Sequence, residues 1–189
     1  MRKTAAAVAI AVLTLGAAGC GNNHDDAHAA AARKARAEQS KAASSLSDKI
    51  MSSQKSGSSS QLFSLTRKQA DCIGKGFVDK IGTDRLQKYG VLDKSLTAKE
   101  GVDNIKMSAP DATSASGVFF DCADVSAMVR KIVARSGQIP QQLQSCVNKA
   151  LNDDSLRPVF TKVFEGRQQD AQKALVRPIM KCAPGSSGG

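Results

Sequence analysis

Histidine is scarce in this 189-residue chain, and its scarcity excludes most catalytic arrangements. The two histidines, His24 and His28, lie near the N-terminus, and residues 65–184 contain none. That region therefore lacks the base of a Ser–His or Cys–His nucleophile and a common ligand of zinc. It also lacks a CxxC pair, the usual signature of thiol oxidoreductases. We expect no catalytic residue, no cofactor and no metal ion in this protein.

Alternation of apolar and polar residues with a period of two is also missing from residues 65–184, which argues against half-buried strands. Apolar residues recur there with the 3.6-residue period of a helix. Capping boxes predict three helix starts, at Thr66 with Gln69, Thr97 with Glu100 and Ser108 with Asp111. Further helices are expected after Thr83, Asp124 and Pro140, near Asp154, and from Ala171 to Cys182. The predicted fold class is all-α, a compact helical domain held by disulfides.

Residues 1–19 have the layout of a secretory signal peptide. Arg2 and Lys3 are followed by an uncharged apolar run from Ala5 to Leu15. This run is about half as long as the roughly 20 residues that a membrane-spanning helix needs. We therefore expect export with processing and no permanent transmembrane segment.

Three small residues, Ala17 to Gly19, stand directly before Cys20. This arrangement resembles the lipobox of bacterial lipoproteins, although Ala17 stands where leucine is usual. The resemblance implies that the Cys20 thiol is acylated, with palmitate among the expected acyl groups, and anchors the protein on the outer side of the cytoplasmic membrane. The alternative is an ordinary signal peptide followed by an incidental cysteine.

The stretch over residues 20–64 is rich in Ala, Ser, Gln and Lys and ends in a low-complexity tract, SSQKSGSSSQ. Such a composition buries too little apolar surface to offset the entropy of ordering the chain. Only Leu46 and Ile50 would give a helix here an apolar stripe. We expect a flexible tether that is helical at most transiently, a folded domain at 65–184 and a disordered tail at 185–189.

Cysteine is present in an odd number, five, which in an exported protein suggests that one has a separate fate. If Cys20 is lipidated, Cys72, Cys122, Cys146 and Cys182 remain for two disulfides in one of three pairings. Most of these cysteines lie on apolar stripes, so buried structural disulfides are expected.

An internal repeat relates the two halves of the domain. When LTRKQADCIGKGFVDKIGTDRLQKYGVL is placed over IPQQLQSCVNKALNDDSLRPVFTKVFEG, their cysteines coincide, and FFDCAD recurs in kind as IMKCAP. We infer two similar units, at about 65–123 and 138–184; chance similarity between amphipathic helices is the alternative.

Equivalent units favour one disulfide within each, Cys72 with Cys122 and Cys146 with Cys182. Loops of 50 and 36 residues would each contribute about 4 kcal/mol in the chain-entropy treatment. That contribution matters for a small domain with no Trp and one Tyr. A crossed pairing of Cys122 with Cys146 remains open, because only 24 residues separate them.

Three segments between Thr66 and Cys182, QADCIGKGFVDKIG, FFDCADV and QSCVNKAL, resemble a set of actinobacterial secreted proteins and lipoproteins of unknown function. That family has helical domains with a duplicated four-cysteine pattern. The resemblance implies a fold and a location and no particular activity.

Positive charge is in excess, with 19 basic and 13 acidic residues between Thr66 and Pro184. A basic exported domain is attracted to anionic surfaces such as phospholipid head groups or acidic wall polymers. Nucleic acid is not expected as a partner outside the cell. Arg130, Lys131 and Arg135 are the candidate binding residues, and Lys149 and Arg157 could extend their positive area. The alternative is that these are ordinary solubilising charges.

Two classes of function compete. The favoured one is a non-catalytic cell-envelope lipoprotein that binds a protein, a lipid or an anionic wall polymer. The alternatives are an envelope hydrolase that uses carboxylates alone and a lipid carrier with an interhelical cavity. The candidate carboxylates are Asp121, Asp124, Asp153 and Asp154. Asp124 and Asp154 are expected to have structural roles at helix starts.

Overall fold

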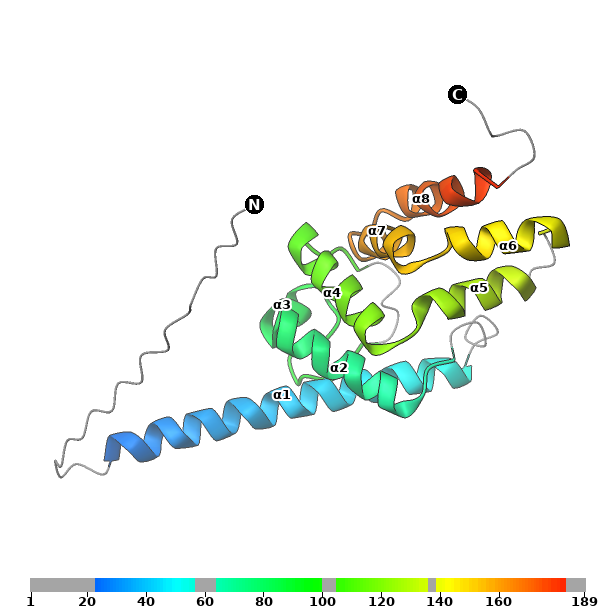
Figure 1. Cartoon of the computed structure of the whole chain (residues 1–189). Helices are drawn as coiled ribbons and strands as arrows, with labels where there is room; N and C mark the ends of the chain where they lie inside the picture. The colour runs from blue at the N-terminus through cyan, green and yellow to red at the C-terminus, as the bar shows by residue number, and fades with distance from the viewer. Residues whose placement is uncertain (1–22, 57–63, 100–104, 136–138, 183–189) are drawn as a thin grey trace, which may run out of the picture. The chain divides into compact units, whose positions relative to one another are not determined.

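A computed structural model of the chain describes residues 23–56, 64–99, 105–135 and 139–182, which contain eight helices and no β-strand (Figure 1). The predicted all-α fold class is confirmed. None of the described helices combines the length and the apolar composition that crossing a membrane requires. In chain order the helices are α1 Asn23–Ser56, α2 Arg67–Ile81, α3 Thr83–Lys88, α4 Ala109–Cys122, α5 Val125–Arg135, α6 Gln141–Ala150, α7 Asp153–Phe164 and α8 Gln168–Met180.

The described residues fall into two units, divided between residues 34 and 35. In the first, the structure describes the opening turns of α1, where the side chains from His28 to Lys34 are exposed. The second unit holds the rest of α1, the other seven helices and both disulfides. Cys20, the predicted signal peptide and the predicted tail at 185–189 lie outside the described residues.

The prediction of a flexible tether over residues 20–64 is wrong for the part of α1 within the second unit. Ala42, Leu46 and Ser47 are buried there, and Ala42 and Leu46 belong to the same core cluster as Ile73 of α2. The sequence argument counted large apolar side chains. It missed this contact because alanine and serine supply much of the buried face, and small residues let helices pack closely.

Two glycines of α2 stand at those close contacts. A Cβ atom at Gly74 would collide with the backbone carbonyl of Ala43 in α1. A Cβ atom at Gly76 would lie 2.6 Å from Cγ1 of Val118 in α4. The helix α2 therefore meets both neighbours at positions that have no side chain.

Helices begin directly after Thr66 and Ser108, as predicted, but only Thr66 forms the predicted capping box. The backbone N–H of Gln69 donates to Thr66 Oγ1 at 3.3 Å, and that of Thr66 donates to Gln69 Oε1 at 2.8 Å. Ser108 precedes α4 but its side chain makes no capping hydrogen bond. The predicted box at Ser108 is wrong because the carboxylate of Asp111 is buried in the domain.

The short helix predicted after Thr97 does not begin where expected, since Ala98 forms an isolated antiparallel bridge with Leu92. Most of that predicted helix, residues 100–104, lies outside the described residues. Asp93 stabilises the turn over residues 93–97, because its Oδ1 accepts the backbone N–H of Ser95 at 2.8 Å and that of Thr97 at 2.9 Å. The hydroxyl of Ser95 contributes most to lowering the pKa of Asp93 below its ordinary value, followed by the Thr97 amide.

Phenylalanine rings join the two hydrophobic clusters of the domain. Phe119 of α4 packs at the border of both clusters. Its ring centroid lies 5.8 Å from that of Phe77 in α2 and 6.3 Å from that of Phe160 in α7. The helix α4 contacts both α2 and α7, and α7 also contacts α8. Tilted contacts between these rings therefore link the two clusters into one core.

The disulfides join Cys72 to Cys122 and Cys146 to Cys182, with Cα–Cα distances of 5.6 Å and 5.7 Å. The pairing predicted within each half is confirmed. The expectation that both bridges are buried is wrong, since Cys72 and Cys146 are exposed and only Cys182 is buried. The relation between the units at 65–123 and 138–184 stays a prediction.

Candidate functional site

The cationic surface predicted on α5 is only partly available. Arg130 is half-buried, and its Nη1 donates to the backbone carbonyl of Leu151 at 3.0 Å. This contact satisfies a carbonyl at the end of α6, so Arg130 has a structural role. Lys131 and Arg135 are exposed, as the sequence predicted.

Of the two residues proposed to extend that surface, Lys149 is exposed and Arg157 is engaged elsewhere. The guanidinium of Arg157 lies 4.8 Å from the centroid of the Phe120 ring and 3.4 Å from a carboxylate oxygen of Asp121. Arg157 therefore contacts α4. Of the five cations predicted for this surface, Lys131, Arg135 and Lys149 are exposed.

The carboxylates considered for acid–base chemistry have structural partners. Asp124 accepts the backbone N–H of Ala127 at 2.8 Å, which caps α5. Asp153, in the first turn of α7, accepts the hydroxyl of Ser126. Asp154 lies in the same first turn. Capping roles were predicted for Asp124 and Asp154; only that of Asp124 has a described hydrogen bond.

Asp111, which the sequence placed in a capping box, is a buried acidic residue. The carboxylate of Asp111 accepts Nη1 of Arg85 at 2.6 Å and the hydroxyl of Tyr89 at 2.7 Å. Arg85 also donates from Nε to the carbonyl of Ile81 at 2.6 Å. These contacts tie α3 to the start of α4, and they explain why the one tyrosine of the chain is placed here. The signal was ambiguous, because Asp at the third position of a helix is also typical of a cap.

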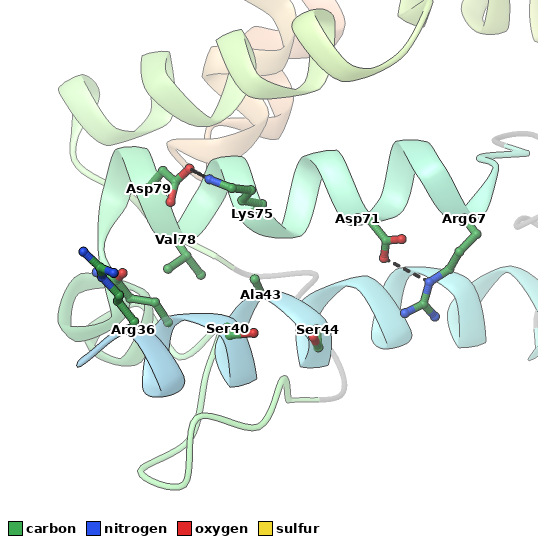
Figure 2. Close-up of a pocket in the computed structure, with 10 residues that line it drawn as sticks. Arg36, Ser40, Ala43, Ser44, Arg67, Asp71, Lys75, Val78 and Asp79 are labelled. Atoms are coloured by element: carbon green, nitrogen blue, oxygen red, sulfur yellow. Dashed lines mark hydrogen bonds and ion pairs between the residues drawn. The ribbon is translucent and has the colours of Figure 1, made fainter. Parts of the chain in front are cut away.

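A groove of about 490 Å³ runs between α1 and α2 (Figure 2). Figure 2 shows Val78 of α2 pointing toward α1, which carries Arg36, whereas Asp79 lies beside Lys75. Its complete lining is Arg36, Gln39, Ser40, Ala43, Ser44, Arg67, Asp71, Lys75, Val78 and Asp79.

Most charges in this groove are already paired. Lys75 forms an ion pair with Asp79, and Arg67 Nε lies 2.9 Å from Asp71 Oδ1. Arg67 also reaches Asp48 at 2.5 Å, and that hydrogen bond is the main reason that its pKa is raised. The groove therefore attracts an ion of either sign only weakly and is best described as the seam where α1 packs on α2.

A second hollow, of about 290 Å³, lies between α7 and α8 and is strongly cationic. Four cationic side chains and one carboxylate line it, together with Ala174. The carboxylate, Asp170, lies 2.7 Å from Nη2 of Arg167. The hydrogen bond from Arg167 is the main cause that lowers the pKa of Asp170, and the charges of Lys173 and Lys162 add to it. We call Lys162, Lys173 and Arg177 the α8 cations.

Two large apolar side chains of α8 stand beside these cations in solvent. Val176 is 49% exposed and Met180 is 63% exposed. This surface was not predicted, because only the apolar residues that face the core were considered. The sequence does contain the pattern: Val176 and Met180 lie off the apolar stripe of Ala171 and Leu175, and they follow Lys173 by three and seven positions, on the same side of the helix.

Among the described residues, no cluster of three His, Cys, Asp or Glu side chains is placed to hold a metal ion. The side chains of residues 23–27, which include His24, lie outside that description. Comparison of the chain with protein-family models, with curated proteins and with solved structures found no match.

Proposed function

We propose that this protein is a lipid-anchored, extracytoplasmic protein that binds an anionic partner and catalyses no reaction. The proposal places it with the actinobacterial secreted proteins and lipoproteins that its cysteine segments resemble. Its partner would be an anionic surface of the cell envelope, a lipid, a wall polymer or an envelope protein.

The observation that carries the proposal is the use of the cysteines. Two disulfides consume Cys72, Cys122, Cys146 and Cys182. Disulfides persist in oxidising compartments, which supports export. Cys20 is then the one cysteine without a place in this pairing. It follows the small residues of a lipobox-like segment, so acylation gives it a role.

Charge supports an anionic partner. The domain has 19 basic and 13 acidic residues between Thr66 and Pro184. Several of its carboxylates are used inside the fold: Asp111 by Arg85 and Tyr89, and Asp170 by Arg167. Cations such as Lys131 and Lys173 stay exposed.

A non-catalytic role is supported by the structural contacts of Asp124 and Asp153. Because both carboxylates accept hydrogen bonds within the fold, they do not form the facing pair of free carboxylates that the hydrolase alternative needs.

The anchor is tested by fractionating cells that produce the parent chain or Cys20→Ala. The parent is expected in the membrane fraction, with incorporation of a labelled fatty acid. Cys20→Ala is expected to lose the label and to leave the membrane fraction. A matched control removes a disulfide pair, Cys146→Ala with Cys182→Ala, and should keep the label. Full membrane retention and labelling of Cys20→Ala would overturn the proposal.

A further inference from the structure

We infer that the outer face of α8, with Lys162 of α7 beside it, is a docking surface for an anionic phospholipid bilayer. The inference deepens the proposed function, on which it rests, by naming the surface and the partner. Five residues form the docking surface: the α8 cations Lys162, Lys173 and Arg177, and the apolar side chains of Val176 and Met180.

The orientation of α8 is set by its opposite face. Ala171 is buried, and Leu175 and Ile179 pack against the second core cluster. Just beyond the helix, Cys182 is bonded to Cys146 of α6. Because this face is held by packing and by a covalent bond, Val176 and Met180 stay turned toward solvent.

The outward residues share one side of the helix. Lys173 precedes Val176 by three positions and Arg177 by four, and Met180 follows these two residues by four and three positions, so each of the two is a neighbour of Lys173 and Met180 on the helix surface. In the described part of the chain, one further large apolar side chain is exposed, that of Val163 at 40%. A basic helix face with exposed apolar residues is typical of helices that lie in a membrane interface.

The charges on this surface are free to meet a partner. Asp170 is the one acidic residue of α8, and Arg167 already holds it at 2.7 Å. Within the described ranges, Lys162, Lys173 and Arg177 form no ion pair with a carboxylate. Three unpaired cations around one hollow are complementary to phosphate groups.

Apolar exposure distinguishes a bilayer from a wall polymer. A wall polyanion would be attracted by the cations, but it would offer Val176 and Met180 no apolar surface to contact. A bilayer offers partners to both kinds of residue, since its head groups contact the cations while the two apolar side chains enter the boundary with the acyl chains. Each basic residue near an anionic membrane strengthens binding about fivefold.

The test measures binding of the full chain carrying Cys20→Ala, so that no lipid anchor contributes. Vesicles of phosphatidylglycerol with phosphatidylcholine are compared with phosphatidylcholine alone, at low and at physiological salt. The apolar run from Ala5 to Leu15 is common to every variant, so its contribution cancels between variants. Replacing the α8 cations together, Lys162→Gln, Lys173→Gln and Arg177→Gln, is expected to weaken binding to anionic vesicles on the order of 100-fold.

A matched variant removes the same charge elsewhere: Lys131→Gln, Arg135→Gln and Lys149→Gln, all at exposed positions. It is expected to lose far less binding than the α8 variant. Val176→Ser with Met180→Ser keeps every cation and should weaken binding while making the remainder more sensitive to salt. In the chain that carries Cys20→Ala and no other change, anionic vesicles should slow the oxidation of Met180 by peroxide.

Equal losses in the two triple variants would show that binding follows net charge and would overturn the α8 surface. Retention on isolated wall polymer without binding to anionic vesicles would assign the partner to the polymer and also overturn it. Neither result bears on the anchor, because membrane release of Cys20→Ala is scored separately in cells.

Discussion

The guanidinium of Arg85 meets the buried carboxylate of Asp111, with Nη1 and Oδ1 2.6 Å apart. The two ends of this pair differ, since the Asp111 side chain is 4% exposed and that of Arg85 is 52% exposed. Loss of the cation would therefore strand a buried charge, whereas loss of the carboxylate would leave a cation that water can solvate.

Arg85→Met is accordingly expected to lower the free energy of unfolding by about 2–3 kcal/mol. Adding Asp111→Asn to it should recover part of that loss, because the buried charge is gone while Tyr89 keeps a polar partner. Chemical denaturation measures both. As a control, Lys75→Met breaks the exposed pair with Asp79 and should change stability by less than about 0.5 kcal/mol. A double variant less stable than Arg85→Met alone would contradict this account.

Gly74→Ala is expected to destabilise the domain by about 1–3 kcal/mol, since the new methyl group would collide with the Ala43 carbonyl of α1. Gly117→Ala is the matched control. It lies inside α4, no atom lies within 4 Å of its Cβ position, and alanine favours the helix, so a gain of about 0.5–1 kcal/mol is expected. Thermal unfolding compares the two. Equal effects would mean that α1 does not pack on α2 in solution.

Removing either disulfide by paired Cys→Ala replacement is expected to cost about 2–4 kcal/mol of stability. Peptide mapping without reduction should recover Cys72 linked to Cys122 and Cys146 linked to Cys182. Recovery of a Cys122–Cys146 linkage would contradict the structure.

Asp93 makes the turn after α3 sensitive to acid. Its pKa is below the ordinary value of 3.8, mainly through the Ser95 hydroxyl, so folding favours its charged form. The stabilisation is complete above the ordinary pKa and is lost as the pH falls through the lowered one. Carboxyl titration by NMR should give a midpoint below 3.8. Asp93→Asn should be less stable at pH 7 and lose less stability on acidification; an unchanged acid response would refute the role of Asp93.

The helical class, most helix starts and the disulfide pairing could be predicted because each depends on local pattern or on spacing. Thr66 and Gln69 form a capping box within one turn, and the cysteine positions recur between the halves. The packing of α1 could not be predicted in this way. It depends on Ala42 and Ser47 meeting a helix that presents Gly74, a relation between segments distant in the sequence.

That the predicted cations of α5 form a binding surface stays a prediction, and their exposure could be predicted only in part. Lys131 and Arg135 are exposed, but Arg130 donates to a carbonyl from another helix, and no pattern within α5 contains that information. Conversely, Lys162 and Lys173 belong to different helices, and only the folded chain brings them to one hollow.

Each disulfide closes a loop of its own, over residues 72–122 and 146–182, and residues 123–145 alone connect the loops along the chain. A protease that cuts inside either loop therefore leaves the domain in one covalent piece. A single cut after Arg135 instead yields two fragments, each with its disulfide intact. Noncovalent contacts would then keep the fragments together, among them those of α4 with α7, where the Ser116 hydroxyl donates to the Arg157 carbonyl at 3.0 Å, and that of Arg130 with the Leu151 carbonyl.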